Sequence, residues 1–365
     1  MCLLMSLELT SKYLEIKDNR QILAITLAIG LVGSLIFVYL KLPLPWIIGA
    51  LFTTTCAAMM GQKLWMPDWM RSTSHLVLGA LFGTSVSPEF IDNFIDWFPS
   101  MVAVTVYVVI VTPPIFFYLV KVSRQDIITA YFSAAPGGLL PMTILGGAMG
   151  GDEKVISLIQ SSRIIVTVLI IPFSFVIFAG YEPTGSVGTG GSFQALNLSD
   201  GLLLFATSII GYLIARSLKI PTPYLMGPMI AVAFFSITGL NSAEVPDSLV
   251  AIAQCIIGSN IGSMFNNVKP KTVAKTLFHG SVTSVFMIGF ATLAALATHY
   301  FTDQSLYGLV LAFAPGGFAE MALVGFALGI DIAFLVTHQF TRFFFVILIV
   351  PLCFPLLKGI NKSHR

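Results

Sequence analysis

The chain has 365 residues, of which 56% are hydrophobic and 10% are charged, and its formal net charge is +2 at pH 7. A soluble domain usually carries about 25% charged residues, so this composition excludes an ordinary soluble enzyme. It predicts an all-α polytopic membrane protein whose first partner is the lipid bilayer. The four cysteines are scattered and indicate neither a disulfide framework nor a metal-ligand pair.

The first 20 residues form a charged segment that contains Lys12, Lys17 and Arg20. It has neither the apolar core nor the small-residue cleavage site of a signal peptide. Basic residues beside a span stay on the cytoplasmic side, so residues 1–20 are expected to be a cytoplasmic N-terminus. The apolar stretches that follow predict five spans, at 21–40, 45–60, 72–87, 98–120 and 155–178.

Between the fourth and fifth spans, the apolar segment 126–150 contains the sequence Ala-Pro-Gly-Gly. Pro136 lacks a backbone donor, and Gly137 and Gly138 are poor helix formers, so a helix is expected to break here. In a bilayer such a break leaves backbone groups without partners. We therefore expect a re-entrant hairpin or an unwound helix that does not fully cross.

The stretch 181–200 is rich in Gly, Ser and Thr and predicts an external linker. A second apolar segment with Ala-Pro-Gly-Gly follows at 305–329, and it contains Pro315, Gly316 and Gly317. Residues 359–365 are expected to be a cytoplasmic C-terminus. The spans predicted in this half are 201–218, 222–240, 248–265, 278–300 and 332–357.

The two halves repeat one sequence. Pro315 follows Pro136 at an offset of 179 residues (315 − 136), and an offset of 178 aligns residues 33–49 with 211–227. The chain is therefore interpreted as a tandem duplication, with membrane repeats at 21–180 and 201–358. Further identical pairs at the larger offset are Met142 and Met321, Asp152 and Asp331, Gln160 and Gln339, and Arg163 and Arg342.

The distribution of Lys and Arg predicts how each repeat is oriented. With five spans per copy, sixteen basic residues fall on the cytoplasmic side and Lys41 alone falls outside, while Arg163 and Arg342 lie within spans. Five is an odd number, so the second repeat is expected to be inverted relative to the first. Inverted repeats with paired broken helices are typical of transporters whose site lies near the midplane at the repeat interface.

Arg163 and Arg342 are the strongest candidates for a substrate site. Arg at a span centre costs about 2.5–3.5 kcal/mol on insertion scales, yet both copies retain it. Gln160 and Gln339 lie three residues earlier and therefore on the same helix face. Two interpretations stay open: a pair that binds an anionic or carbonyl group of the substrate, or side chains that bond exposed carbonyls at each break.

Three further features complete the candidate site. Asp152 and Asp331 are expected to cap the helices that carry the arginines. Glu320, whose counterpart is Pro141, is either a proton-coupling or cation-binding carboxyl or the ion-pair partner of an arginine. His338 is the one histidine placed beside the site, and no histidine has Cys or Glu at metal-ligand spacing. The sequence therefore predicts neither a metal nor another cofactor.

The repeated block Ala-Pro-Gly-Gly-x-x-x-Met, followed by Leu-x-Gly-x-Ala-x-Gly-x-Asp and Gln-x-x-Arg, resembles the bacterial membrane AbrB family over nearly the whole chain. The resemblance implies a duplicated membrane domain in the bacterial inner membrane. Family members are labelled as ammonia monooxygenases or as regulators of gene expression. A monooxygenase of that kind needs a His-rich copper or iron site, which the sequence does not indicate. The chain has no basic recognition segment, so direct binding to nucleic acid is not expected.

Three functions follow, in order of support. The first is secondary transport of a small molecule or ion with the site at the repeat interface. The second is a membrane sensor that affects gene expression indirectly through a partner. The third is an ammonia monooxygenase-like enzyme. The substrate, the coupling ion and a homo-oligomeric state are left open.

Overall fold

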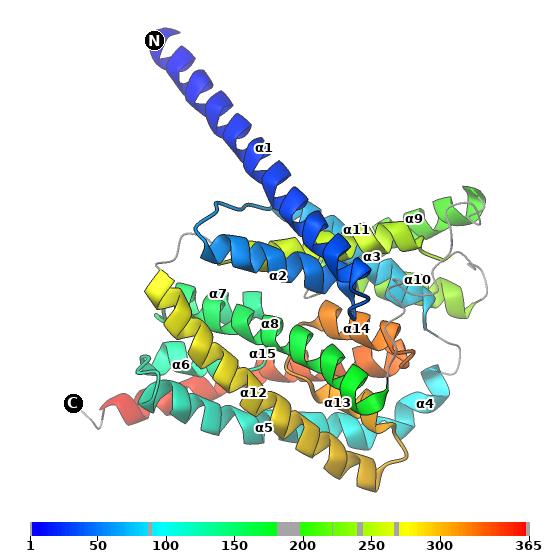
Figure 1. Cartoon of the computed structure of the whole chain (residues 1–365). Helices are drawn as coiled ribbons and strands as arrows, with labels where there is room; N and C mark the ends of the chain where they lie inside the picture. Colours follow the sequence, from blue (N-terminus) through cyan, green and yellow to red (C-terminus); the bar gives the residue numbers. More distant parts are fainter. Residues whose placement is uncertain are drawn as a thin grey trace.

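The computed structural model describes residues 2–86, 90–180, 198–220, 222–238, 244–265 and 270–362. All regular secondary structure in these ranges is helical (Figure 1). The predicted linker 181–200 lies mostly outside the described residues, apart from its last three, which begin a helix. The helices of the first half are α1 (Cys2–Tyr39), α2 (Pro45–Met59), α3 (Asp68–Thr84), α4 (Phe90–Asp96), α5 (Phe98–Lys121), α6 (Ile127–Ala134), α7 (Leu139–Ala148) and α8 (Glu153–Ala179).

The second half has the same order of helices. Its members correspond in sequence to α1, α2, α3, α4 with α5, α6, α7 and α8, because at the offset of 179 the first turns of α12 correspond to α4 and the rest of α12 to α5. They are α9 (Leu198–Ser217), α10 (Pro223–Ile237), α11 (Asp247–Ser263), α12 (Pro270–Phe301), α13 (Leu306–Phe313), α14 (Phe318–Ala327) and α15 (Ile332–Lys362).

Within the described part of the chain, six helical stretches are long and apolar enough to cross a membrane. They fall in α1, in α4–α5, and in α8, α9, α12 and α15. Both α2 and α10 have 15 residues, and both α3 and α11 have 17, which is short for an upright span of about 20 residues. The all-α class is thus confirmed, with six helices of membrane-spanning length where ten spans were expected, and the inverted arrangement stays a prediction.

The two halves interlock through pairs of corresponding contacts. Between the halves, helix α2 packs on α11, and the corresponding α10 packs on α3; within each half, α1 packs on α2, and α9 on α10. Helix α8 packs on α12, and the corresponding α15 packs on α5. The two halves therefore form one body, because helices of each half pack against helices of the other.

Glycines permit the closest of these contacts. Gly79 and Gly258 each begin a Gly-x-x-x-Gly sequence, and a Cβ on Gly79 would overlap the carbonyl of Leu225, while a Cβ on Gly258 would overlap that of Ile47. The first contact joins α3 to α10, and the second joins α11 to α2. Small residues let helix backbones approach this closely inside a membrane.

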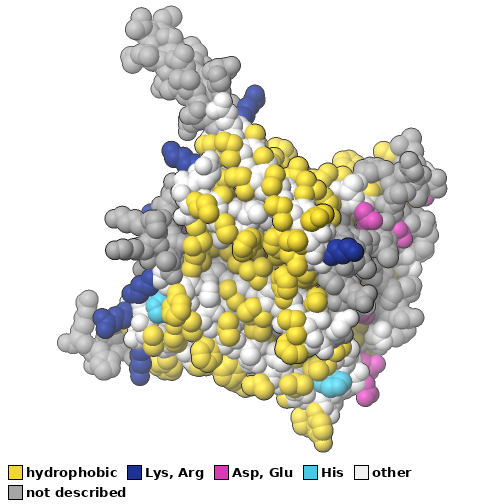
Figure 2. Space-filling model, in the orientation of Figure 1, with side chains coloured by type: hydrophobic (Ala, Val, Ile, Leu, Met, Phe, Trp, Pro, Cys, Tyr) yellow, Lys and Arg dark blue, Asp and Glu magenta, His cyan; other side chains and the backbone are white. Residues whose placement is uncertain are grey.

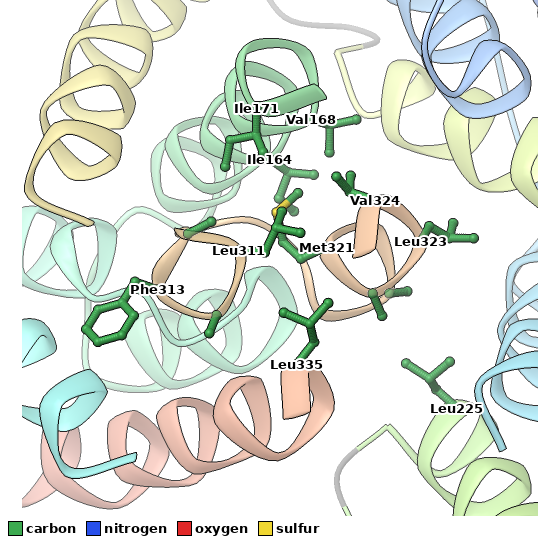
Figure 3. Close-up of a cluster of buried hydrophobic side chains, with 14 of the residues drawn as sticks. Ile164, Val168, Ile171, Leu225, Leu311, Phe313, Met321, Leu323, Val324 and Leu335 are labelled. Carbon is green, nitrogen blue, oxygen red and sulfur yellow. The ribbon is translucent and has the colours of Figure 1, made fainter. Parts of the chain in front are cut away.

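The second broken segment lies mostly inside the molecule, whereas in the first one α6 is buried and α7 exposes Leu140 and Ile144. The first consists of α6 and α7 and the second of α13 and α14, so both helices are interrupted at Ala-Pro-Gly-Gly as predicted. Figure 3 shows the second segment between α8 and α15, with Leu311 and Met321 beside Ile164. These side chains belong to one continuous apolar core that is drawn from both halves.

Candidate functional site at the two helix breaks

Each broken segment begins with a capped short helix. The Asp126 carboxylate accepts the Thr129 amide at the start of α6, and the Ser305 hydroxyl, at the corresponding position, accepts the Gly308 amide at the start of α13. Both helices end after eight residues. The chain is then extended at Ala135 and Ala314, because the following proline disfavours helical geometry in the residue before it.

A buried methionine covers the first glycine of each break. Met142 and Met321 are fully buried. A Cβ on Gly137 would lie 2.8 Å from the Met142 Cε, and one on Gly316 would lie 2.7 Å from the Met321 Cε. Gly and Met are therefore linked sterically, which explains why Pro-Gly-Gly-x-x-x-Met occurs twice. Gly138 also adopts a φ of +90°, a conformation that favours glycine.

The glutamines of the two long helices bond the ends of the short helices. The Gln160 Nε2 of α8 donates to the carbonyls of Phe132 at 2.9 Å and Ala135 at 3.1 Å. The Gln339 Nε2 of α15 donates to the carbonyls of Leu311 at 2.8 Å and Ala312 at 3.4 Å. The last carbonyls of a helix lack intrahelical partners, so each glutamine replaces the bonds that the break removes.

The arginines complete this cap. Arg163 donates to the Ala135 carbonyl at 3.2 Å. Arg342 donates to the carbonyls of Phe313 and Gly316, each at 3.3 Å, and to that of Ala314. Of the two open interpretations of the arginines, bonding to the carbonyls at the breaks is therefore observed. Arg342 also donates to the Gln339 side chain, whereas the corresponding Oε1 of Gln160 has no partner.

Some buried hydrogen-bonding groups at the breaks have no partner. The Nε atoms of both arginines are buried without a hydrogen-bond partner, and so is the Ser133 hydroxyl on α6. Arg163 and Arg342 are 3% and 4% exposed, and neither forms an ion pair within the described residues. Two positive charges are thus held in the interior without a carboxylate, an arrangement that is unfavourable unless an anion joins it.

Glu320 lies in the first turn of α14, beside the second break, and is 8% exposed. Its carboxylate folds back so that it would overlap a Cβ on Gly317. The expected alternative of an ion pair between Glu320 and an arginine is not formed in the described structure. Glu320 is therefore a buried carboxyl near the break without a salt-bridge partner.

His338 lies on α15, one residue before Gln339, and both ring nitrogens contact protein atoms. The Nδ1 is 2.7 Å from the Phe334 carbonyl, and the Nε2 is 2.7 Å from the Ser100 hydroxyl on α5. The ring joins α15 to α5 and is completely buried. Its assignment to a substrate site stays a prediction, and its observed contacts are those of a helix-packing residue.

Tyr107 is a site neighbour that the sequence did not single out. It is buried on α5, its hydroxyl donates to the Met287 carbonyl of α12, and its ring centroid lies 5.6 Å from that of Phe313 at the end of α13. Its counterpart at an offset of 179 is Phe286. The repeat therefore gives no signal for Tyr107, because the polar atom occurs in one copy only.

The predicted helix caps are confirmed. Asp152 accepts the amides of Lys154 and Val155 at the start of α8, and Asp331 accepts the amides of Ala333 and Phe334 at the start of α15. Within the residues that the structure describes, no three His, Cys, Asp or Glu side chains gather in a group that could hold a metal ion.

Comparison with known proteins gives the family. A protein of Bacillus subtilis (strain 168) named "Uncharacterized protein YhjN" is 27% identical over 93% of this chain and 94% of its own length. The "Putative regulator AbrB" of Escherichia coli (strain K12) is 21% identical over 90% of this chain and 93% of its own. The family described as "Transition state regulatory protein AbrB" matches residues 46–358, and the chain belongs to this family.

Proposed function

We propose that the protein is a secondary transporter of a small anionic solute, and that the solute binds between the two helix breaks at the interface of the repeats. One observation carries this proposal: two buried guanidinium groups face the breaks, each with an unpartnered Nε, and neither has an ion-pair partner in the described residues. An anion would supply the missing charge and accept the free N–H groups.

The helix directions support an inverted pair of repeats. Figure 1 draws α5 running toward the left and its counterpart α12 toward the right, and α8 and α15 are likewise opposed. On the face in Figure 2, most Lys and Arg atoms lie at the left edge and the Asp and Glu atoms at the right edge, with apolar side chains between them. This pattern agrees with the positive-inside rule applied along those helices.

The geometry of the breaks favours an anion over a cation. Each break is followed by the N-terminus of a second short helix, α7 or α14. The N-terminal end of a helix carries partial positive charge and free amides. In transporters with inverted repeats, half-helix ends of this kind lie at the substrate site near the midplane.

A ligand screen followed by a flux assay tests the proposal. The purified full chain is heated in detergent with phosphate, sulfate, small carboxylates, and neutral or cationic analogues of similar size. We expect one class of anions to raise the midpoint of thermal unfolding and to be exchanged by proteoliposomes. The effect should be lost in Arg163→Met and retained in Arg71→Met, which removes a partly buried arginine that is ion-paired with Asp68.

Two outcomes would reject anion transport at this site. One is exchange of neutral or cationic solutes alone. The other is unchanged anion exchange in a folded Arg163→Met variant.

A second candidate, a membrane sensor, is favoured by the printed name of the E. coli relative, which calls that protein a regulator. Stabilisation by an anion that depends on Arg163, together with an absence of flux, would support the sensor instead.

A further inference from the structure

An apolar groove runs along the outside of the first half, between α5, α6 and α15. Its volume is about 470 Å³. The walls Val109 and Phe117 are more than half exposed, whereas the floor is buried. The floor is formed by Val108, Val346 and Val350.

The polar groups within the groove are already bonded to the protein. The Thr112 hydroxyl donates to the Val108 carbonyl at 2.7 Å, and the Tyr131 hydroxyl donates to the Val350 carbonyl at 2.8 Å. The ammonium group of Lys121 is different, because it forms no ion pair within the described residues and lies 6.0 Å from the Phe117 ring centroid. The groove thus offers an occupant apolar surface along its length and one free cation at its end.

These features fit one occupant. From Val108 to Lys121 the groove follows α5 for about 20 Å at about 1.5 Å per residue, somewhat more than half of a hydrocarbon core about 30 Å thick. We propose that the groove binds an anionic phospholipid, with one acyl chain along α5 and the phosphate at Lys121. Arg124, which is exposed just beyond the helix, adds a second positive charge at that end.

The features that α5 contributes to the groove are not repeated in its counterpart α12. Pro113 and Pro114 lie inside α5, where neither supplies a backbone donor, and Pro113 lines the groove. At an offset of 179 the second repeat has Thr292 and Leu293 at these positions and Tyr300 in place of Lys121. The two prolines and the terminal charge are therefore both absent from α12.

The groove also reaches the first helix break. A Cβ on Gly137 would lie 2.5 Å from the Val346 Cγ1, and Val346 follows Arg342 by one helical turn. A lipid in the groove would therefore contact the face of α15 that packs against the break.

The test measures lipid binding to the purified full chain by native mass spectrometry and by thermal unfolding. The probes are phosphatidylglycerol and phosphatidylcholine with identical acyl chains. We expect phosphatidylglycerol to bind with one high-affinity copy and to raise the unfolding midpoint more than phosphatidylcholine does. Lys121→Gln should weaken the binding of phosphatidylglycerol about five-fold, which corresponds to about 1 kcal/mol for one basic residue near an anionic surface. Val109→Trp should abolish binding of the high-affinity lipid molecule, because the larger side chain fills the groove.

Matched variants on α12 control for general effects. Leu293→Trp changes a side chain that is 64% exposed, and Lys275→Gln removes an exposed cation, so both should leave binding unchanged. Equal binding of the two lipids to the unaltered chain would overturn the proposal. So would full binding to Val109→Trp with its native size-exclusion profile retained, or a groove variant that changes the oligomeric state while phosphatidylglycerol does not bind.

Discussion

At the scale of single residues, the two arginines form different numbers of hydrogen bonds to the rest of the protein. Arg163 bonds one carbonyl, whereas Arg342 bonds three carbonyls and the Gln339 side chain. Each buried polar group left without a partner costs about 1–3 kcal/mol. We therefore expect Arg342→Met to lower the thermal-unfolding midpoint in detergent clearly more than Arg163→Met does.

The comparison between the two methionine variants is the control, since both remove one buried charge and leave a side chain of similar length. Equal loss of stability in the two variants would show that burial of the charge, and not the carbonyl cap, dominates the energetics of the breaks.

A variant of Glu320 can distinguish ion or proton coupling from binding of the solute. It is buried beside the second break without an ion pair in the described residues, and intramembrane carboxyls of this kind mark coupling sites. If the protein is a transporter, Glu320→Gln should retain solute exchange between equal pools. It should lose accumulation driven by an ion or proton gradient, because the amide neither titrates nor carries charge.

Proteoliposomes that contain the stabilising anion measure both activities in one preparation. The conclusion would be wrong if Glu320→Gln still accumulated solute against its gradient at the unaltered rate.

The sequence was informative about this site only to a point. Helical spacing placed Gln and Arg on one face, and the caps Asp152 and Asp331 followed from their position before a helix. The alternatives for the arginines could not be resolved, because their carbonyl partners lie 26–29 residues upstream in another element. The contact of His338 with Ser100 joins residues 238 positions apart, a distance over which periodicity carries no information.

At the scale of elements, helix packing depends on a few glycines. Gly258 brings α11 against the backbone of α2, so a side chain there must push the helices apart. Overpacking of a well-filled contact costs about 1–3 kcal/mol. We expect Gly258→Leu to lower the thermal-unfolding midpoint, whereas Gly289→Leu on α12 should not, because no atom lies within 4 Å of a Cβ at Gly289.

Both variants replace a helical glycine by the same side chain, so a change in helix propensity or expression affects them alike. Equal midpoints for the two would show that α2 and α11 can separate without loss of stability.

Breaks and helix ends were the predictable part of the fold, because Pro and Gly mark them. The short helix α4 and the start of α3 at Asp68 were not predicted, since neither segment is a continuous apolar run. The pairing of α2 with α11 could not be predicted either. Helices that are apolar on every side, as most of these are, show no stripe that identifies the buried face.

At the scale of the whole molecule, the inverted arrangement makes a prediction about equivalent turns of the two repeats. If the repeats are inverted, such turns must lie on opposite sides of the membrane. Lys41 and Lys219 occupy the same turn of the two copies, and both adopt positive φ values, 51° and 54°. Inversion places Lys41 outside and Lys219 in the cytoplasm. The same argument places Lys121, at the end of α5, inside and Tyr300, near the end of α12, outside.

Single cysteines at these four exposed positions, in a chain whose four native cysteines are replaced by alanine, test the arrangement. A membrane-impermeant maleimide applied to intact cells should label positions 41 and 300, and positions 121 and 219 should react only after the membrane is opened. Each pair is its own control, because its members have equivalent local structure and differ only in the side of the membrane. Labelling of both members of a pair from one side would mean that the repeats are parallel, and a substrate site formed by opposed broken helices would then be excluded.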